Sequence, residues 1–166
     1  LSQEDQELIR RYDRHYIDGG GREGLPLLSA EGVTHLKNQY LGEVYEVDGA
    51  FRLLYSALAF RGLLDNTYLA FTSDHGESFG EFGLFCHTNP LHWPELHIPL
   101  LVRPPGGCSG ERVQATVGLY DLYPSFLSIA DLPVPEYVTR PALFDTEGLA
   151  ELPLNSVTFA QNAHQH

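Results

Sequence analysis

The segment TYLAFTSDHGE, residues 67–77, changes character abruptly at Ser73. Its first part is a continuous run of β-branched, aromatic and aliphatic residues, which predicts a buried strand in a parallel sheet. An acid and a histidine, Asp74 and His75, follow this run directly. Because binding sites in open α/β sheets lie outside the carboxyl ends of strands, the adjacent pair marks a candidate functional site.

A long amphipathic helix is predicted before this strand, over residues 30–61. Ser29 provides its start signal and Gly62 its stop signal. A shorter helix is expected over residues 1–17, with Ser2 as its N-cap and acidic residues in its first turn. Apolar residues recur along the long helix at steps of three and four, and they form a single stripe: Val33, Leu36, Tyr40, Val44, Val47, Phe51, Leu54 and Leu58.

The rest of the chain alternates between expected loops, strands and helices. No internal repeat is present, and the alternation predicts a single unit with an α/β-layered fold. The expected elements, in order, are a loop rich in glycine and proline at 74–96, a second buried strand at 97–104, a turn at 105–111, a short strand at 112–118, a helix at 119–132, an ordered surface loop at 133–155 and a last strand at 156–161.

The chain is acidic. Its 166 residues carry a formal net charge of −12, which disfavours nucleic acids and anionic membranes as partners because both require clusters of Lys and Arg. The basic residues are nine arginines and one lysine, Lys37. Many acids with almost no lysine indicate a salt-adapted surface, and the alternative is an ordinary acidic protein from a GC-rich genome.

Neither a secretory signal nor an apolar run of the roughly 20 residues that span a bilayer is present in the sequence. The chain is therefore expected to be soluble, and its cellular location is left open. It begins with Leu1 and contains no methionine, so it is expected to be a fragment, a processed product or a trimmed polypeptide. Cys86 and Cys108 belong to no CxxC pair, and both are expected to be reduced.

Asp74 and His75 have the chemistry of metal ligands. A carboxylate oxygen and an imidazole nitrogen together suit a divalent cation. Gly76 permits the sharp turn that would bring both side chains to one ion, and Glu77 is placed to orient a ligand from behind. The alternative for a bare Asp-His pair is a simple turn in which the aspartate caps the loop.

The unit TSDHGE, residues 72–77, resembles the sulfatase branch of the alkaline phosphatase-like hydrolases. The similarity extends in order over residues 40–135, with residues 1–39 as a helical lead-in and 136–166 as a surface loop and last strand. It implies part of an αβα-layered catalytic domain with a mainly parallel sheet. The similar segments are YLGEVYEVDGAFRLLYSAL at 40–58, GLLDNTYLAFTSDHGESFGEFG at 62–83, LHIPLLVRPPG at 96–106 and VGLYDLYPSFLSIADLPVP at 117–135.

The resemblance implies roles for three residues. Asp74 and His75 would ligate a divalent metal, and His87, twelve residues further on, would contact the sulfate or phosphate oxygens of a small anionic ester. Calcium is the ion that the family implies. Many sulfatases have Asn where His75 stands, so this softer ligand keeps manganese and zinc open.

The resemblance implies a sulfate ester hydrolase whose nucleophile and further acidic ligands lie in a missing N-terminal portion. The isolated chain is therefore expected to have no turnover. Two alternatives remain: a phosphoester or phosphonate hydrolase or phosphoethanolamine-type transferase of the same superfamily, and a non-catalytic binding module. The segment CSGER at 108–112 is not expected to supply the nucleophile, since it lacks the Pro and Ser of the sulfatase motif C-x-P-S-R. His92 is a weaker candidate than His87, and His97 is expected to be structural.

Overall fold

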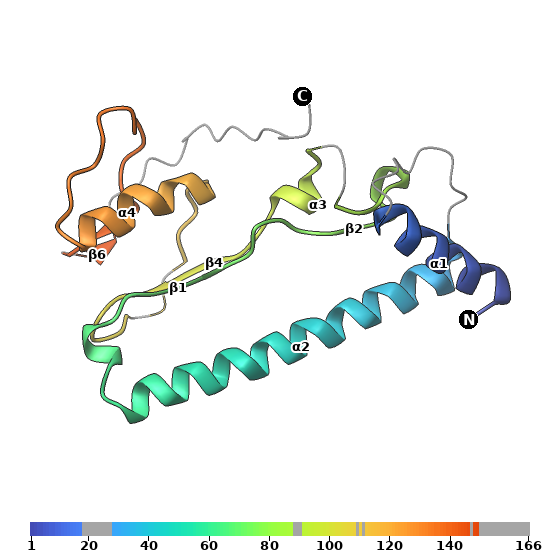
Figure 1. Ribbon diagram of the computed structural model, residues 1–166, viewed down its shortest axis with the longest axis horizontal. Coiled ribbons are helices and arrows are strands. Elements are labelled where there is room, and N and C mark those ends of the chain that lie inside the picture. The colour runs from blue at the N-terminus through green and yellow to red at the C-terminus, as the bar shows by residue number, and fades with distance from the viewer. Residues whose placement is uncertain (18–27, 88–90, 109, 111, 147, 150–166) are drawn as a thin grey trace.

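A computed structural model describes residues 1–17, 28–87, 91–108, 110, 112–146 and 148–149, and Figure 1 shows their arrangement. The helices are α1 (Gln3–Ile17), α2 (Ala30–Phe60), α3 (Trp93–Leu96) and α4 (Leu122–Ile129). The strands are β1 (Leu69–Thr72), β2 (Ser78–Phe79), β3 (Phe85–Cys86), β4 (Leu100–Arg103), β5 (Phe144–Asp145) and β6 (Gly148–Leu149).

The two expected N-terminal helices are confirmed. In α2, the side chain of Ser29 accepts a hydrogen bond from the Gly32 N–H at 3.1 Å, as an N-cap does. The helix ends before Gly62, whose positive φ of 66° is readily adopted by glycine. In α1, the Ser2 hydroxyl accepts from the Asp5 N–H at 3.0 Å. Local capping chemistry thus sets three of these four helix ends.

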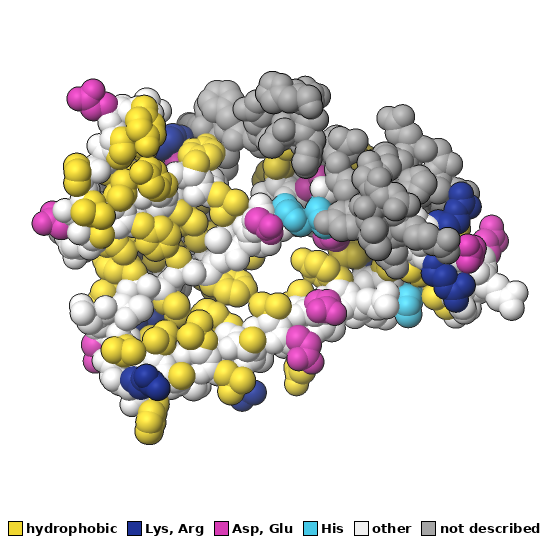
Figure 2. All heavy atoms as spheres, viewed as in Figure 1, with side chains coloured by type: hydrophobic (Ala, Val, Ile, Leu, Met, Phe, Trp, Pro, Cys, Tyr) yellow, Lys and Arg dark blue, Asp and Glu magenta, His cyan; other side chains and the backbone are white. Residues whose placement is uncertain are grey.

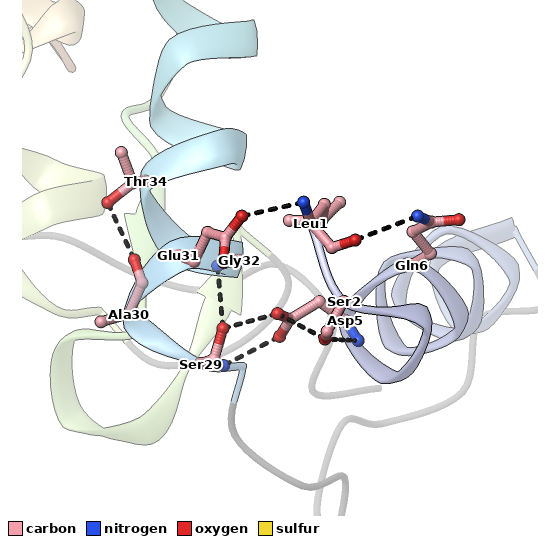
Figure 3. A network of polar contacts seen from close by, with 9 residues as sticks. All are labelled: Leu1, Ser2, Asp5, Gln6, Ser29, Ala30, Glu31, Gly32 and Thr34. Atoms are coloured by element: carbon pink, nitrogen blue, oxygen red, sulfur yellow. Dashed lines mark hydrogen bonds and ion pairs between the residues drawn. The ribbon is translucent and has the colours of Figure 1, made fainter.

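A buried carboxylate ties the two helices together (Figure 3). Asp5 of α1 is 2% exposed and accepts hydrogen bonds from the Ser29 N–H at 3.0 Å and the Ser29 hydroxyl at 2.5 Å. These hydrogen bonds hold the pKa of Asp5 below its ordinary value. A β-carbon added at Gly32 would lie 2.7 Å from an Asp5 oxygen, so any larger residue there would displace the Asp5 carboxylate.

The central strands pair differently from the sequence prediction. β1 and β4 are antiparallel, with Leu69 opposite Arg103 and Thr72 opposite Leu100. The expected parallel relationship is wrong for this pair, and a parallel sheet is not shown by the described residues. A parallel pair needs a crossover connection, usually a helix, whereas the only α-helix among the described residues between β1 and β4 is the four-residue α3. β1 is half-buried along its length, less than the buried strand expected.

The segment expected as a loop at 74–96 contains short regular structure. β2 and β3 form an antiparallel hairpin, in which Ser78 lies opposite Cys86 and Phe79 opposite Phe85. Phe85 is 4% exposed and packs in a small core with Leu8 and Leu28. This hairpin therefore joins the candidate site to the N-terminal helices.

A second packed region surrounds α4. The helix predicted at 119–132 is observed as a 3₁₀ turn followed by α4, whereas residues 112–118 form no strand. The expected loop at 133–155 contains β5 and β6, and Phe144 of β5 is 1% exposed. The strand expected at 156–161 lies outside the described residues.

The buried carboxylate of Asp121 accepts hydrogen bonds from Arg140. This pair connects the segment that follows α4 to the residue that precedes α4. The Arg140 Nε lies 2.7 Å from one Asp121 oxygen, and its terminal nitrogen lies 3.0 Å from the other. The Gly118 N–H also donates to Asp121, at 2.8 Å. Hydrogen bonding to Asp121 raises the pKa of Arg140, so the guanidinium remains charged.

Much of the apolar stripe on α2 is exposed. Its N-terminal part packs on the small core, and Phe51 contacts Phe71 of β1 edge to face, with ring centroids 5.1 Å apart. Figure 2 shows hydrophobic side chains gathered on the surface over the C-terminal half of α2 and over α4. The most exposed apolar side chains of α2 are Leu41, Tyr45, Leu53, Leu54 and Phe60, the last at 93%.

Candidate active site

The Asp-His pair lies directly beyond the end of β1. The Ser73 hydroxyl donates to the His75 carbonyl at 2.7 Å, and the Asp74 carboxylate accepts from the His75 N–H at 3.0 Å. These local bonds turn the backbone sharply. The Asp74 side chain is 83% exposed and the His75 side chain is 43% exposed, so the described residues leave both side chains open to a ligand.

The two side chains suit one divalent cation. The Asp74 Oδ2 and the His75 Nε2 lie 3.6 Å apart. Metal–ligand bonds of about 2.0–2.6 Å allow both atoms to reach the same ion. The hydrogen bond from the His75 backbone, followed by the charge of the His75 ring, lowers the pKa of Asp74, which favours the anionic ligand form. No group of three or more metal-binding side chains is found among the described residues.

His87 lies against this pair. Its ring stacks on the ring of His75, with centroids 3.9 Å apart and planes inclined by 24°. His87 follows β3, whereas His75 follows β1, so the contact joins the ends of two different sheets. The structure therefore brings together all three residues selected from the sequence: Asp74, His75 and His87.

Glu77 contacts His87. Its Oε2 lies 3.0 Å from the His87 Nδ1, and the two side chains are 21% and 24% exposed. The sequence analysis placed Glu77 behind a metal ligand, whereas in the structure Glu77 contacts the other histidine, His87. The pairing has a structural origin: Ser78 and Cys86 are the first cross-strand pair of the β2–β3 hairpin, and Glu77 and His87 are the residues directly outside it.

The turn of α3 supports this loop from behind. The Gly76 N–H donates to the Glu95 carbonyl at 2.7 Å, and the Ser78 hydroxyl donates to the Glu95 carboxylate at 3.0 Å. A β-carbon on Gly76 would collide with the Pro94 carbonyl oxygen. Glycine is thus required at position 76 by close contact with α3. The sequence showed the glycine but gave no signal for its neighbour, which lies eighteen positions away.

His92 and His97 stack on other aromatic rings. His92 stacks on Phe82 with ring centroids 4.5 Å apart, and His97 stacks on Trp93 at 4.7 Å. Neither has a metal-binding partner set in the part of the chain that is described. Cys108 is an exposed free cysteine, as expected, and Cys86 is half-buried.

Comparison with known families gives an independent assignment. Residues 3–132 match the family model described as Sulfatase, which is most of the chain and includes every residue of the cluster. The chain belongs to the sulfatase family. Members of this family have an alkaline phosphatase-like α/β fold, hydrolyse sulfuric esters and generally depend on a divalent metal.

Curated sulfatases are similar to the chain over much of its length. Arylsulfatase K of Xenopus laevis is 33% identical over 130 residues, which cover 78% of this chain and 23% of the relative. Arylsulfatase K of Homo sapiens is 32% identical over 133 residues, which cover 80% of this chain and 23% of the relative. The Extracellular sulfatase SULF-1 homolog of Drosophila melanogaster is 35% identical over 103 residues, which cover 62% of this chain and 9% of the relative.

The chain thus spans about a quarter or less of the length of these relatives. Within the described residues, no helix has the length and apolar character needed to cross a membrane.

Proposed function

We propose that this chain carries part of the active site of a sulfate ester hydrolase. In this proposal Asp74 and His75 ligate the metal, and His87 contacts the sulfate oxygens of the substrate. The observation that carries the proposal is the face-to-face contact between the rings of His75 and His87 at 3.9 Å. Side chains twelve positions apart, from different sheets, meet beside an accessible carboxylate.

Asp74 and His75 contribute one oxygen and one nitrogen donor. When bound, a divalent ion polarises the ester oxygens and offsets the negative charge that develops on them. Calcium is the ion that the family resemblance implies. The imidazole of His75 is a softer donor than an amide oxygen, and it supports manganese or zinc as alternatives.

His87 acts on the anionic end of the substrate. A sulfate monoester carries its negative charge on terminal oxygens, and a preorganised donor placed beside them stabilises charge that grows in the transition state. The ring of His87 is held by contacts on two sides, with His75 and with Glu77. A held ring needs little reorganisation when the substrate binds.

The proposed substrate class is a small sulfate ester, and the names of the relatives point to an aryl ester as the first test compound. The histidine at position 75 also supports a phosphoester hydrolase of the same superfamily as the second candidate. Aryl sulfate and aryl phosphate therefore need to be compared on the same protein.

We propose that the partner of this chain is the remaining portion of a sulfatase catalytic domain. The relatives are several times longer than the matched segment. The chain exposes large apolar side chains on α2, including Tyr45, Leu53 and Phe60. Contiguous apolar surface of this kind is typical of an interface. The nucleophile and the remaining metal ligands are proposed to come from that portion.

The test uses the protein in which these 166 residues form part of a complete catalytic domain. Asp74→Asn and His75→Ala are expected to lower kcat/KM for an aryl sulfate by at least about 100-fold, since loss of groups that stabilise transition-state charge has that scale. Asp48→Asn, on the exposed face of α2, is the matched control. Unchanged kcat/KM in both site variants would exclude the proposed role, and preference for aryl phosphate would favour the second candidate.

A further inference from the structure

Glu95 of the short helix α3 is a buried acid that contacts the loop between His75 and His87 at two points. Its backbone carbonyl accepts a hydrogen bond from the Gly76 N–H at 2.7 Å, and its carboxylate accepts from the Ser78 hydroxyl at 3.0 Å. Glu95 is 9% exposed and Ser78 is 1% exposed, so water competes little for the contact between them. Glutamate is almost never buried this deeply unless it is paired, which indicates that the contact with Ser78 keeps it there.

The backbone contact of Glu95 bears on His75. Gly76 follows His75 directly, and the His75 Nδ1 lies 2.9 Å from the Gly76 carbonyl oxygen. The same glycine packs so closely against the Pro94 carbonyl oxygen that no β-carbon would fit. The backbone that follows His75 is therefore held by α3.

The side-chain contact of Glu95 bears on His87. Ser78 lies opposite Cys86 in the β2–β3 hairpin, and His87 follows Cys86 directly. Cys86 has a φ of 64°, in the left-handed region that residues other than glycine keep only where the surrounding structure enforces it. This turn sets the direction in which the chain leaves β3 toward His87. The hydrogen bond from Ser78 to Glu95 anchors the facing strand, so it helps to hold the turn.

We propose that Glu95 is a positioning residue that holds the rings of His75 and His87 against each other. Its two contacts reach both sides of the loop, and the two rings meet with their centroids 3.9 Å apart. Glu95 acts through Gly76 and Ser78, and not on the substrate itself. The inference deepens the proposed function, and its effect on activity rests on that function. The ring contact is measured without substrate, metal or turnover.

The variants address the side-chain contact, because the backbone carbonyl of residue 95 is present in all of them. Glu95→Ala removes the acceptor of the Ser78 hydroxyl, and Ser78→Ala removes the donor. Glu95→Gln keeps a carbonyl oxygen in the place of the carboxylate oxygen and is the conservative rescue. Glu43→Gln, at an exposed position on α2, is the matched control.

The ring contact is observed by NMR in the complete catalytic domain, which is deuterated except for ¹³C,¹⁵N-labelled histidine and is kept in EDTA. A nuclear Overhauser cross-peak between the ring protons of His75 and His87 is assigned by its loss in His87→Asn. Wild type, Glu95→Gln and Glu43→Gln are expected to show the cross-peak, and Glu95→Ala and Ser78→Ala are expected to lose most of its intensity. The signals of His35 on α2, and of His97, which stacks on Trp93 of α3, report whether each variant keeps its fold.

Steady-state kinetics of the same protein give a second readout. Glu95→Ala is expected to lower kcat/KM for an aryl sulfate by about 10–100-fold, the usual scale for residues that hold metal ligands in place. Glu95→Gln should retain most of the activity. Since Ser78 and Glu95 share one hydrogen bond, the double variant should lose little more kcat/KM than either single variant.

The proposal is overturned if the wild type shows no cross-peak, if Glu95→Ala keeps it while His35 and His97 are unchanged, or if the two losses of kcat/KM add in full. If Glu95→Ala does not fold, Ser78→Ala must lose the cross-peak and Glu95→Gln must keep it, and any other result overturns the proposal. Loss of the cross-peak in Glu95→Ala, together with an inactive wild-type domain, would leave Glu95 assigned and count against the proposed function alone.

Discussion

His75 and His87 stack face to face, with their ring centroids 3.9 Å apart. One ring comes from the turn beyond β1 and the other from the end of β3, so a single contact fixes the distance between the proposed metal ligands and the proposed substrate donor. Because the rings are stacked, a substitution of one histidine also removes a packing contact of the other. The two histidines are therefore expected to behave as a unit in mutational tests.

The hydrogen-bonding capacity of His87 is expected to matter more for activity than the shape of its ring. In the complete catalytic domain, His87→Leu should lower kcat/KM for an aryl sulfate by about 100-fold, because it removes a donor from developing charge. His87→Lys supplies a hydrogen-bond donor at the same position and should retain more activity than His87→Leu. Equal loss in both variants, measured by steady-state kinetics, would show that the role of His87 is packing.

Gly76→Ala is expected to destabilise the loop. The added methyl group would collide with the Pro94 carbonyl oxygen, and overpacking of this kind costs about 1–3 kcal/mol. Gly49→Ala is the matched control: no atom lies within 4 Å of its would-be β-carbon, and alanine in a helix interior is favoured by up to about 1 kcal/mol. Urea denaturation of both variants gives the comparison, and a neutral Gly76→Ala would contradict the close contact with α3.

Removal of the Arg140 side chain is expected to lower the free energy of unfolding strongly. Asp121 is 0% exposed, and Arg140→Ala would leave its carboxylate buried without its charged partner, at a cost of about 3 kcal/mol. Arg140→Lys keeps the positive charge but not the bidentate hydrogen bonding to Asp121, so it should lose less stability than Arg140→Ala. Arg52→Ala, on the exposed side of α2, is expected to change the free energy of unfolding little. A loss no larger than that of Arg52→Ala would exclude a stabilising role for the pair.

Asp5 is expected to contribute to the acid sensitivity of the fold. Hydrogen bonds from Ser29 lower its pKa below the ordinary value of 3.8. The unfolded state thus binds a proton more readily, so the stabilisation from Asp5 is complete above about pH 4 and is lost as the pH falls through the lower, folded pKa. Asp5→Asn should flatten the fall in melting temperature below pH 4, and Asp48→Asn should not. A parallel fall in both variants would argue against this contribution.

Local signals in the sequence were sufficient for the two N-terminal helices, α1 and α2. The periodicity from Val33 to Leu58 and the cap at Ser29 define α2 because both act within a few residues. The same holds for the existence of β1, whereas the roles of Asp74 and His75 at its end stay a prediction. His87 was selected by resemblance, and its contact with His75 agrees with that choice without testing its role.

The features that the sequence did not predict depend on distant pairs. The antiparallel pairing of β1 with β4 is a tertiary property that a short apolar run does not encode. Asp5 meets Ser29 across 24 positions, and Asp121 meets Arg140 across 19. The strands β5 and β6 have two residues each, too few for an alternation pattern. The salt-adapted surface stays a prediction.

The most direct test of the account is binding of a paramagnetic ion. Mn²⁺ is titrated into the ¹⁵N-histidine-labelled chain, because its broadening of nearby signals detects even the weak binding expected from two donors. The account predicts that His75 and His87 broaden first, that Asp74→Asn abolishes this preference, and that Asp48→Asn leaves it intact. Uniform broadening of all histidines, or the same preference in Asp74→Asn, would contradict a metal site at the end of β1.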